Sequence, residues 1–227
     1  FIVNNTEENA FKEESIEFDW YMGMNWQMRL KSSHSLHENI LQIHPESRIL
    51  EVSTKSDNYN LGRSLSAFNL TLNGIPIENI FQSSKVFSDG GPYIDLLQKT
   101  PTEAKKDPRI STITNNRHLI SFRLNKKDYP IEPKSFFYDY IYILALSKNN
   151  YLSTEIMNYN IFTDIEFNQK TPYSEKRGPF NCQARSCAIF VWLKQNDLLK
   201  NYCKNPQTFI DTIYPKQKPN PKQPSLF

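Results

Sequence analysis

The chain has 227 residues, of which 38% are hydrophobic and 13% aromatic, so it can bury a real core and is not a wholly disordered chain. No apolar run approaches the roughly 20 residues that cross a bilayer, so no membrane role is expected. The net charge of +3 is compatible with nucleic-acid binding but does not demonstrate it. Glycine is rare, and its single adjacent pair, Gly90-Gly91, argues against a P-loop NTPase or a GxGxxG dinucleotide-binding domain.

The cysteines and histidines indicate neither a disulfide scaffold nor a metal centre. Cys182, Cys187 and Cys203 form no CxxC motif, which favours a reducing, cytoplasmic setting. His34-x-x-His37 and His44 have no cysteine or carboxylate to complete a zinc site. We therefore expect no metal and no cofactor. A Cys182 nucleophile is not favoured, because no histidine lies near it in the sequence.

Composition divides the chain into three parts. Residues 1–15 are polar and acidic and are expected to form a loose arm, and residues 214–227 form a Pro/Lys-rich tail that is expected to be disordered. Residues 16–213 contain no linker and no repeat, and are predicted to form one domain.

Hydrophobic periodicity and turn residues predict a series of helices and short strands. Helices are expected at 33–43, at 77–87 after Pro76, at 102–106 with Thr102 as cap, at 135–147, at 152–158, and from a cap at Asn181 to about Leu199. Strands are expected at 49–53, at 68–72 before an Asn73-Gly74 turn, at 119–124 and at 161–167. Because no regular βαβ rhythm appears, the predicted fold class is α+β, helix-rich with a small sheet.

The predicted helix 77–87 carries a polar wedge beside an apolar face. At 100° per residue, Glu78, Gln82 and Lys85 share one narrow sector, next to Ile77, Ile80, Phe81 and Phe87. A lysine at the edge of a core can lose part of its charge by desolvation and become a nucleophile for an anomeric carbon. An ordinary surface ion-pair stripe is the alternative.

Three further groups of residues are candidates for the site. On a strand, Asp164 and Glu166 would point to one face as an acid/base pair, or would be charges protecting a sheet edge. If Asn181 caps a helix, Arg185 and the free N–H groups suit a phosphate, unless Arg185 pairs with an acid of the fold. Gly90-Gly91 permits close backbone approach to a ligand and Tyr93 offers a ring, although these glycines also suit a plain helix-ending turn.

Several segments together resemble the NADAR superfamily. Its core pattern is similar to Ser66-Ala-Phe68, Ile77-Glu-Asn-Ile-Phe-Gln-Ser-Ser-Lys85 and Pro101-Thr-Glu-Ala-Lys105. The flanking segments 51–56, 61–66, 90–93, 132–139, 162–168 and 181–186 resemble the branch associated with DarT-type DNA ADP-ribosyltransferase toxins. The chain departs from the family pattern at Asn79, where the family has histidine, at Ala67, where it has asparagine, and in a longer segment at 171–179.

The resemblance implies an enzyme that removes ADP-ribose from guanine in single-stranded DNA, with a DarT-type toxin as its functional partner and ADP-ribose as product. The family lysine and glutamate fall on Lys85 and Glu78. In the resulting hypothesis Lys85 forms an imine with the anomeric carbon, and Glu78, Asp164 or Glu166 moves protons. The expected ligand contacts are Phe68, Phe81, Gln82, Gly90, Gly91, Tyr93, Asn181, Gln183 and Arg185, and the expected DNA contacts are Lys105, Lys106 and Arg109.

Two other functions remain open from the sequence. One is an N-glycosidase that acts on a small metabolite. The other is a binding module for ADP-ribose or nucleic acid without chemistry, which the departures at Asn79 and Ala67 allow.

Overall fold

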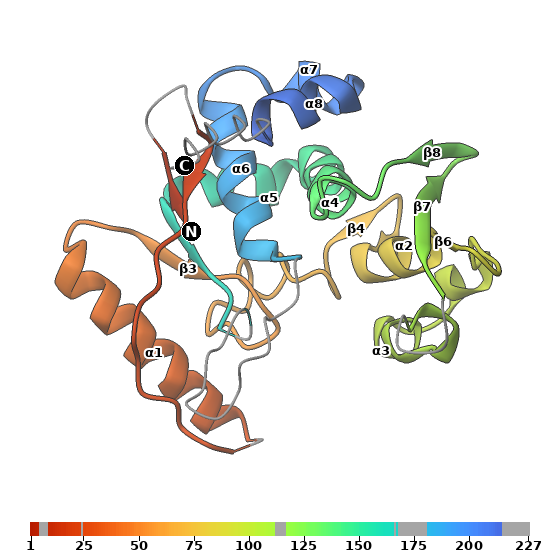
Figure 1. Cartoon of the computed structure of the whole chain (residues 1–227). Coiled ribbons are helices and arrows are strands. Elements are labelled where there is room, and N and C mark those ends of the chain that lie inside the picture. The colour runs from red at the N-terminus through yellow and green to blue at the C-terminus, as the bar shows by residue number, and fades with distance from the viewer. Residues whose placement is uncertain (5–8, 24, 112–116, 166, 168–180, 215–227) are drawn as a thin grey trace, which may run out of the picture.

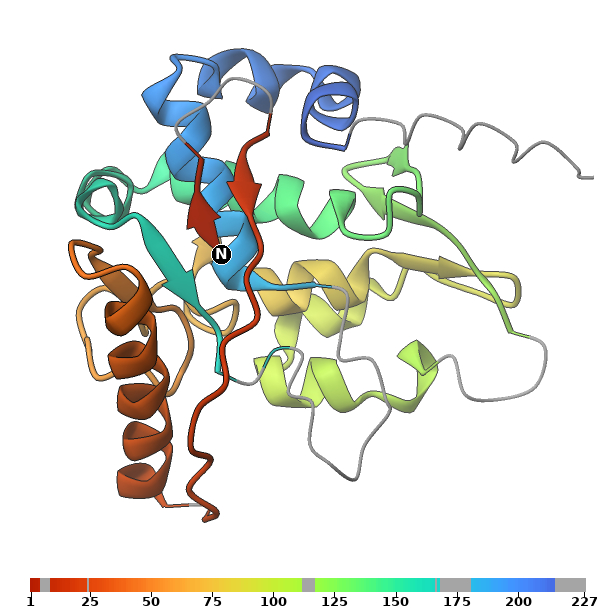
Figure 2. The ribbon, with the colours of Figure 1, turned by 60° about the vertical axis from the view of Figure 1, so that its left-hand side comes forward.

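The computed structural model describes residues 1–4, 9–23, 25–111, 117–165, 167 and 181–214. It has the predicted α+β class: helices predominate, and the strands form small sheets at two sides of a helical centre (Figures 1 and 2). Within the described residues, no helix is long and apolar enough to span a bilayer.

Two apolar helices that pack against each other form the centre, namely α4 (Phe136–Lys148) and α6 (Gln183–Gln195). Both are buried around most of their circumference, which explains why their sequences are apolar on every face rather than amphipathic. The prediction for α4 is confirmed. The predicted cap of α6 is wrong: Cys182 occupies the cap position without a side-chain hydrogen bond, and the helix ends at Gln195.

A four-stranded sheet of order β2-β1-β9-β3 packs beside α6, built from β1 (Ile2–Val3), β2 (Phe11–Lys12), β3 (Ile49–Glu51) and β9 (Ile161–Thr163). The segment expected to be a loose arm therefore supplies two strands. Ile2 pairs with Ile161, Val3 is buried, and the rings of Phe1 and Phe11 lie 5.6 Å apart. Of the described residues of this segment, Val3 and Ala10 are buried while Glu13 is exposed, and the average composition does not reveal that division.

Helix α1 (Trp26–Ile43) flanks this sheet and begins seven residues before the predicted 33–43, at an Asn25 cap whose side chain accepts from Met28 N at 2.9 Å. Leu36 and Ile40 pack on Ile161 in a small separate core. The remaining C-terminal elements are α5 (Asn150–Glu155), the 3-10 turn η3 (Ile156–Asn158), α7 (Leu199–Lys204) and α8 (Pro206–Ile213).

A hairpin introduces the short helix α2 (Ile77–Ser83). Its strands, β4 (Thr71–Leu72) and β5 (Ile75–Pro76), are joined by the predicted turn, in which Asn73 and Gly74 have φ of 54° and 82°. The predicted helix 77–87 is too long, because the chain leaves the helix at Ser84 and continues as β6 (Lys85–Phe87). The carbonyls at the end of the helix accept hydrogen bonds from residues outside it: Tyr93 N donates to Ser83 O, and Arg123 N donates to Ser84 O.

Strand β6 joins β7 (Leu119–Leu124) and β8 (Lys127–Tyr129) in an antiparallel sheet, which confirms the predicted strand 119–124. Between β6 and β7 run η1 (Ile94–Gln98), α3 (Pro101–Lys106) and η2 (Pro108–Ile110). Helix α3 is capped by Thr100 rather than the predicted Thr102, in a capping box with Glu103.

The segment 52–66 crosses from β3 toward α2 without regular strands but is tightly held. Asn58 Oδ1 accepts from Leu61 N at 2.9 Å, and Ser56 Oγ accepts from Asn58 N at 3.2 Å. Gly62 lies so close to this turn that a Cβ on it would stand 2.0 Å from Ser56 Oγ and 2.4 Å from Glu51 O. The segment therefore has one packed conformation that requires glycine at this position.

We expect Gly62→Ala to lower the free energy of unfolding by about 1–3 kcal/mol, because backbone atoms of Glu51 must move to admit the methyl group. Urea denaturation measures the change. Gly74→Asn is the control, since a Cβ there meets nothing within 4 Å and asparagine tolerates its φ of 82°. Equal losses in the two variants would contradict the close packing at Gly62.

Candidate active site

Lys85 stands at the start of β6 with its side chain turned onto the ring of Phe81. The distance from Lys85 Nζ to the ring centroid is 5.0 Å. Burial lowers the Lys85 pKa to about 8, and the charge of Glu78 opposes that shift. Among the described residues Lys85 Nζ makes no hydrogen bond or ion pair. A lysine with this pKa is partly neutral near neutral pH, and a neutral amine can act as a nucleophile.

Glu78 and Gln82 occupy one face of α2, as predicted. Gln82 Nε2 donates to Glu78 Oε1 at 2.7 Å, and both residues are buried. Lys85 does not share this face by helical periodicity, since it lies beyond the helix end; the turn into β6 nevertheless returns it to within the electrostatic influence of Glu78. The prediction that Lys85 lies near Glu78 is therefore right, but the reason given for it, a shared helix face, is wrong.

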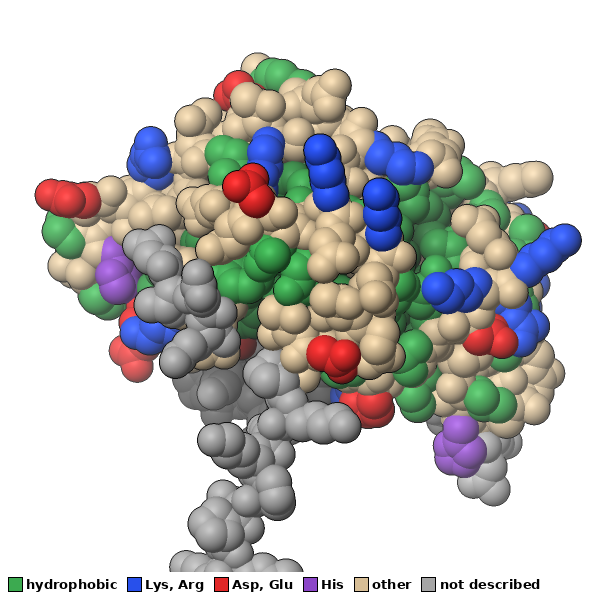
Figure 3. All heavy atoms as spheres, turned by 90° about the horizontal axis from the view of Figure 1, so that it is seen from above, with side chains coloured by type: hydrophobic (Ala, Val, Ile, Leu, Met, Phe, Trp, Pro, Cys, Tyr) green, Lys and Arg blue, Asp and Glu red, His purple; other side chains and the backbone are tan. Residues whose placement is uncertain are grey.

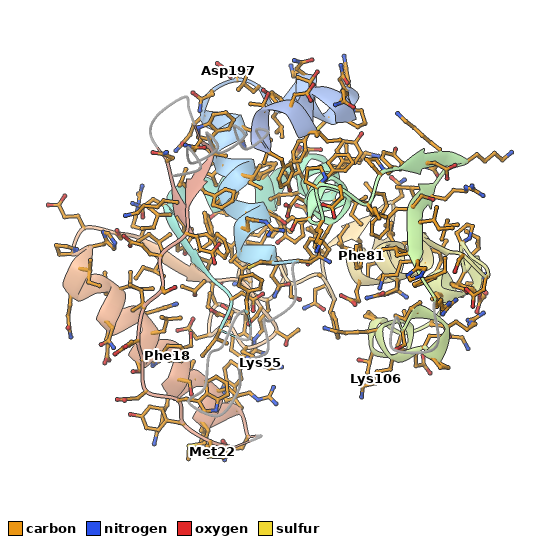
Figure 4. The ribbon with its side chains drawn as sticks, viewed as in Figure 1. Phe18, Met22, Lys55, Phe81, Lys106 and Asp197 are labelled. Carbon is orange, nitrogen blue, oxygen red and sulfur yellow. The ribbon has the colours of Figure 1, made fainter. Side chains whose placement is uncertain are left out.

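Phe81 forms the apolar floor beneath Lys85. Its ring contacts Phe122 at 5.3 Å, Phe137 at 6.4 Å and, edge-on, Tyr138 at 5.4 Å between centroids. Figure 4 shows Phe81 between α2 and α4. Because these rings exclude water from one side of the amine, they supply the desolvation that lowers its pKa.

Tyr138 of α4 is a site residue that the sequence analysis did not single out. Burial raises its pKa well above the usual value, and the negative charges of Glu78 and Asp164 raise it further. Both carboxylates therefore lie near one phenol, whose hydroxyl makes no hydrogen bond with the described residues. The signal in the sequence is the family resemblance over 132–139, which by itself assigns Tyr138 no role.

Asp164 directly follows β9, which ends at Thr163, so the predicted strand to Phe167 is too long. A turn replaces it, with Phe167 N donating to Asp164 O at 2.8 Å. The argument that Asp164 and Glu166 share a strand face therefore fails for Asp164. Glu166 lies outside the described residues.

Buried Glu51 holds this end of β9 in place. It accepts hydrogen bonds from Ser53 Oγ and Thr163 Oγ1, both at 2.6 Å, and from Ile165 N at 3.1 Å. Thr163 Oγ1 in turn lies 2.9 Å from His37 Nε2. Asp164, between two of these anchored residues, is positioned by the network rather than by strand pairing.

Buried polar atoms near α2 and α6 have no hydrogen-bond partner among the described residues. They are Gln82 Oε1, Asn79 Oδ1, Ser66 Oγ and Asn181 Oδ1. Each is a position where a bound polar molecule could be recognised, because buried groups left unpaired are rare in native proteins. Gln82 and Asn181 were both predicted to contact the ligand.

Gln183 joins the start of α6 to α2. Its Oε1 accepts from Ala67 N at 2.8 Å, and Ala67 O accepts from Glu78 N at 2.9 Å. The Ser66-Ala67-Phe68 segment thus lies between two predicted site residues and meets both through its backbone. Substitution of the family asparagine by Ala67 leaves these backbone contacts intact.

Asn79 points toward η1, on another side of α2. Its Nδ2 donates to Leu96 O at 2.8 Å and to Lys99 O at 2.7 Å. This departure from the family histidine therefore has a structural role of its own.

Arg185 is held by Asp139, the alternative that the sequence left open. Arg185 Nε and Nη2 donate to Asp139 Oδ2 and Oδ1 at 3.1 and 3.2 Å, and the Asp139 side chain is fully buried. Ser186 Oγ and the Tyr214 hydroxyl also donate to Asp139. The Asp139 carboxylate thus joins α4, α6 and the end of α8, and the Arg185 guanidinium is one of the donors at that junction.

The Gly90-Gly91 turn packs closely against another part of the protein, so its glycines are not facing open space. A Cβ on Gly91 would lie 2.3 Å from Lys85 O, and its φ is 101°. The Tyr93 hydroxyl accepts from Arg117 Nη2, and the ring lies 4.9 Å from the Arg109 guanidinium. Gly91 therefore packs against the backbone of Lys85, and Tyr93 already interacts with Arg117 and Arg109.

The predicted DNA contacts differ in how much charge they leave free. Arg109 pairs with Asp95 and Asp107 at 2.6 and 2.9 Å. Lys105 Nζ lies 5.3 Å from the ring of Phe68, which brings a basic group beside the predicted ligand contact. Lys106 extends from the outer side of α3 (Figure 4).

The histidines and Cys182 have separate surroundings. His34 bonds Asp57, His37 bonds Thr163 and His44 bonds Glu14. Within the part of the chain that is described, no three histidine, cysteine or acidic side chains converge as a metal site. Burial raises the Cys182 pKa well above its usual value, which keeps that thiol protonated.

A cavity of about 690 Å³ lies between the N-terminal segment and α1. Asp164 and Ile165 line it, together with Phe18 and Trp20 of the N-terminal segment and Leu36 and Ile40 of α1. Lys85 and Glu78 are not part of its lining. Asp164 is therefore the site residue that this cavity reaches.

Comparison with known proteins identifies the relatives of this chain. A search of curated proteins found no significant match. Residues 1–223 match the family described as DarT1-associated NADAR antitoxin, which is almost the full length. Lys85, Glu78, Gln82 and the Ser66–Phe68 segment, which carry the sequence resemblance, lie together around α2. The chain is a member of the DarT1-associated NADAR antitoxin family.

Proposed function

We propose that this protein is a glycohydrolase that removes ADP-ribose from guanine in single-stranded DNA and so reverses the modification made by a DarT1 toxin. The observation that carries the proposal is Lys85: its pKa is lowered to about 8, its amine rests on Phe81, and a carboxylate lies near it. Membership in an antitoxin family associated with DarT1 supports the substrate class.

The proposed reaction has two stages. Neutral Lys85 Nζ adds to the anomeric carbon of the ring-opened distal ribose, the bond from that carbon to guanine nitrogen breaks, and the guanine nitrogen takes up a proton. This leaves a protonated imine between Lys85 and ADP-ribose. Water then adds to the imine carbon, the carbon–lysine bond breaks, and ADP-ribose closes its ring and leaves.

Three groups of the candidate site are proposed to move the protons. Glu78 is buried beside Gln82, and Asp164 begins the anchored turn after β9. Burial and both carboxylates raise the pKa of the Tyr138 hydroxyl, which keeps it protonated and suits it to donate a hydrogen bond to the departing guanine. Gln82 Oε1 and Asn181 Oδ1 are buried acceptors without partners among the described residues, suited to ribose hydroxyls.

A borohydride trap tests the proposal. The protein is incubated with an oligonucleotide carrying ADP-ribosylated guanine, and the products are mapped by mass spectrometry. Released unmodified DNA with an ADP-ribose adduct on Lys85 is the expected result. Release without an adduct would overturn the imine and leave carboxylate-activated water. No release would favour a small-metabolite N-glycosidase or an ADP-ribose reader, which turnover of small N-glycosides and an ADP-ribose titration would separate.

We expect Tyr138→Phe to lower kcat by about 10²-fold or more while leaving the melting temperature nearly unchanged, because its hydroxyl makes no hydrogen bond with the described residues. Tyr142→Phe, one turn later on α4, is the matched control. Its hydroxyl donates to Leu65 O in the core, so that variant is expected to lose stability and keep kcat. The opposite pattern would remove Tyr138 from the chemistry.

A further inference from the structure

Exposed aromatic side chains gather near the N-terminal end of α1. Trp20 is 45% exposed, Tyr21 40% and Tyr59 61%, and the ring of Trp26 lies 5.8 Å from that of Tyr59. Figure 4 labels neighbouring Met22 at this end of α1 and Lys55 between α1 and the centre of the molecule. Large exposed rings in one place are unusual on a free protein surface and mark a binding surface.

Two basic side chains lie over rings of this region, in two groups. The Arg63 guanidinium lies 3.6 Å from the ring centroid of Tyr59 and 4.0 Å from that of Trp26, and Lys31 Nζ lies 5.9 Å from that of Tyr21. Arg63 Nε donates to Ser56 O at 2.8 Å, and no carboxylate of the described residues pairs with its guanidinium. We call Trp20, Tyr21, Trp26, Lys31, Tyr59 and Arg63 the aromatic–basic patch.

The patch is physically joined to the candidate active site. Val52 N donates to Thr163 O at 2.8 Å, directly before Asp164, and Ala67 O accepts from Glu78 N at 2.9 Å. Tyr59 and Arg63 lie on the segment between those two anchors. The cavity lined by Asp164 also reaches Trp20. Trp20 of the patch and Asp164 of the candidate site therefore border the same cavity.

The chemistry of the patch selects its occupant. Rings accept unpaired bases by stacking, and unneutralised cations accept phosphates, which is how single-stranded nucleic acid is bound without sequence preference. A duplex has its bases already stacked and would gain only the charge contacts. Arg109, in contrast, is neutralised by two aspartates and has less charge to offer a phosphate.

We propose that the aromatic–basic patch binds the single-stranded DNA that flanks the modified guanine. This inference rests on the proposed function for its biological substrate, but binding itself is measurable without any chemistry. The segment that carries Tyr59 and Arg63 is held in one conformation by Asn58, Ser56 and Gly62, so the patch is preformed.

The first test measures the binding of an unmodified, fluorescently labelled single-stranded oligonucleotide by anisotropy. Tyr59→Ala is expected to raise Kd about tenfold and Tyr59→Phe to restore it, because the ring rather than the hydroxyl stacks on a base. Arg63→Gln is expected to reduce the slope of log Kd against log salt by about 0.7, the value for one contact to a single strand. Melting curves check that each variant is folded.

Two controls separate the patch from general exposure and charge. Tyr151→Ala removes a tyrosine that is 57% exposed on α5, and Kd is expected to stay unchanged. Lys200→Ala with Lys204→Ala removes charge from α7, on the face where Figure 3 shows lysine and arginine side chains spread widely. If these controls weaken binding as much as Tyr59→Ala, the patch has no special role and the proposal is overturned.

A second test separates this inference from the proposed function. With an ADP-ribosylated oligonucleotide, Tyr59→Ala is expected to raise KM about tenfold without changing kcat. With an ADP-ribosylated guanosine, it is expected to change neither. Failure of the wild type to hydrolyse either substrate would contradict the proposed function while the anisotropy result stands. Tyr59→Ala that weakens binding of the purified toxin but not of DNA would overturn the inference in favour of a protein interface.

Discussion

Replacement of Lys85 by alanine is expected to lower the rate of ADP-ribose removal by at least about 10³-fold, while ADP-ribose binding is retained. The variant loses the amine that attacks the anomeric carbon, whereas the unpaired acceptors of Gln82, Ser66 and Asn181 remain. The rate is measured by release of unmodified DNA, and binding by calorimetric titration with ADP-ribose.

Lys85→Arg is the matched control for charge. Arginine keeps the positive charge above Phe81 but stays protonated at all accessible pH, so it cannot form the imine. Equal inactivity of both variants with preserved ADP-ribose binding would agree with a nucleophilic lysine. Substantial activity of the arginine variant would mean that Lys85 acts only as a charge, and the covalent scheme would be wrong.

The pH profile of the wild type gives an independent test. Since burial lowers the Lys85 pKa to about 8, the neutral, reactive fraction grows as pH rises, and the rate is expected to increase with a midpoint at about pH 8 and to level off above it. The charge of Glu78 raises this pKa, so Glu78→Gln is expected to move the midpoint to lower pH besides reducing the rate. A midpoint that does not move would separate Glu78 from the titration of Lys85.

The largest expected loss of stability comes from Asp139→Asn. This change removes the charge that compensates buried Arg185, and is expected to cost about 3–5 kcal/mol of unfolding free energy. It also weakens the acceptor for Ser186 Oγ and the Tyr214 hydroxyl, which joins α6 and the end of α8 to α4. Urea denaturation followed by circular dichroism measures the effect.

An exposed ion pair of the same kind is the control. Arg123 Nε lies 2.6 Å from Asp128 Oδ1, and the two side chains are 43% and 55% exposed. Asp128→Asn is expected to cost no more than about 1 kcal/mol, because water already solvates both charges. A double change, Asp139→Leu with Arg185→Met, is expected to recover part of the loss by removing the unpaired charge. A loss at Asp139 no larger than at Asp128 would refute the buried junction.

Local sequence was sufficient wherever an element depends on its own residues. An apolar run predicted α4, the strand-like segment 119–124 predicted β7, and Asn73-Gly74 predicted the turn into α2, because each pattern is recognised over a few neighbouring residues. The pairing of Glu78 with Gln82 likewise follows from helical spacing alone.

Long-range contacts determine the end of α2 and the N-terminal strands, for which the local sequence patterns gave wrong predictions. Helix α2 ends at Ser83 because Tyr93 and Arg123 supply hydrogen bonds to its last carbonyls, and that places Lys85 on a strand. The first residues become strands only because β9, about 160 positions later, offers an edge. Neither the donors Tyr93 and Arg123 nor the edge of β9 can be identified from the local sequence of the segment that each one shapes.

The candidate site divides in the same way. Residue types and their resemblance to a family identify Lys85, Glu78 and Gln82 without knowledge of the fold. Tyr138, the anchored position of Asp164 and the commitment of Arg185 to Asp139 depend on how α2, α4, α6 and β9 pack together. Burial and charge at a side chain are sums over neighbours that lie far away in the sequence, so the pKa of Lys85 and the partner of Arg185 are properties of the folded chain.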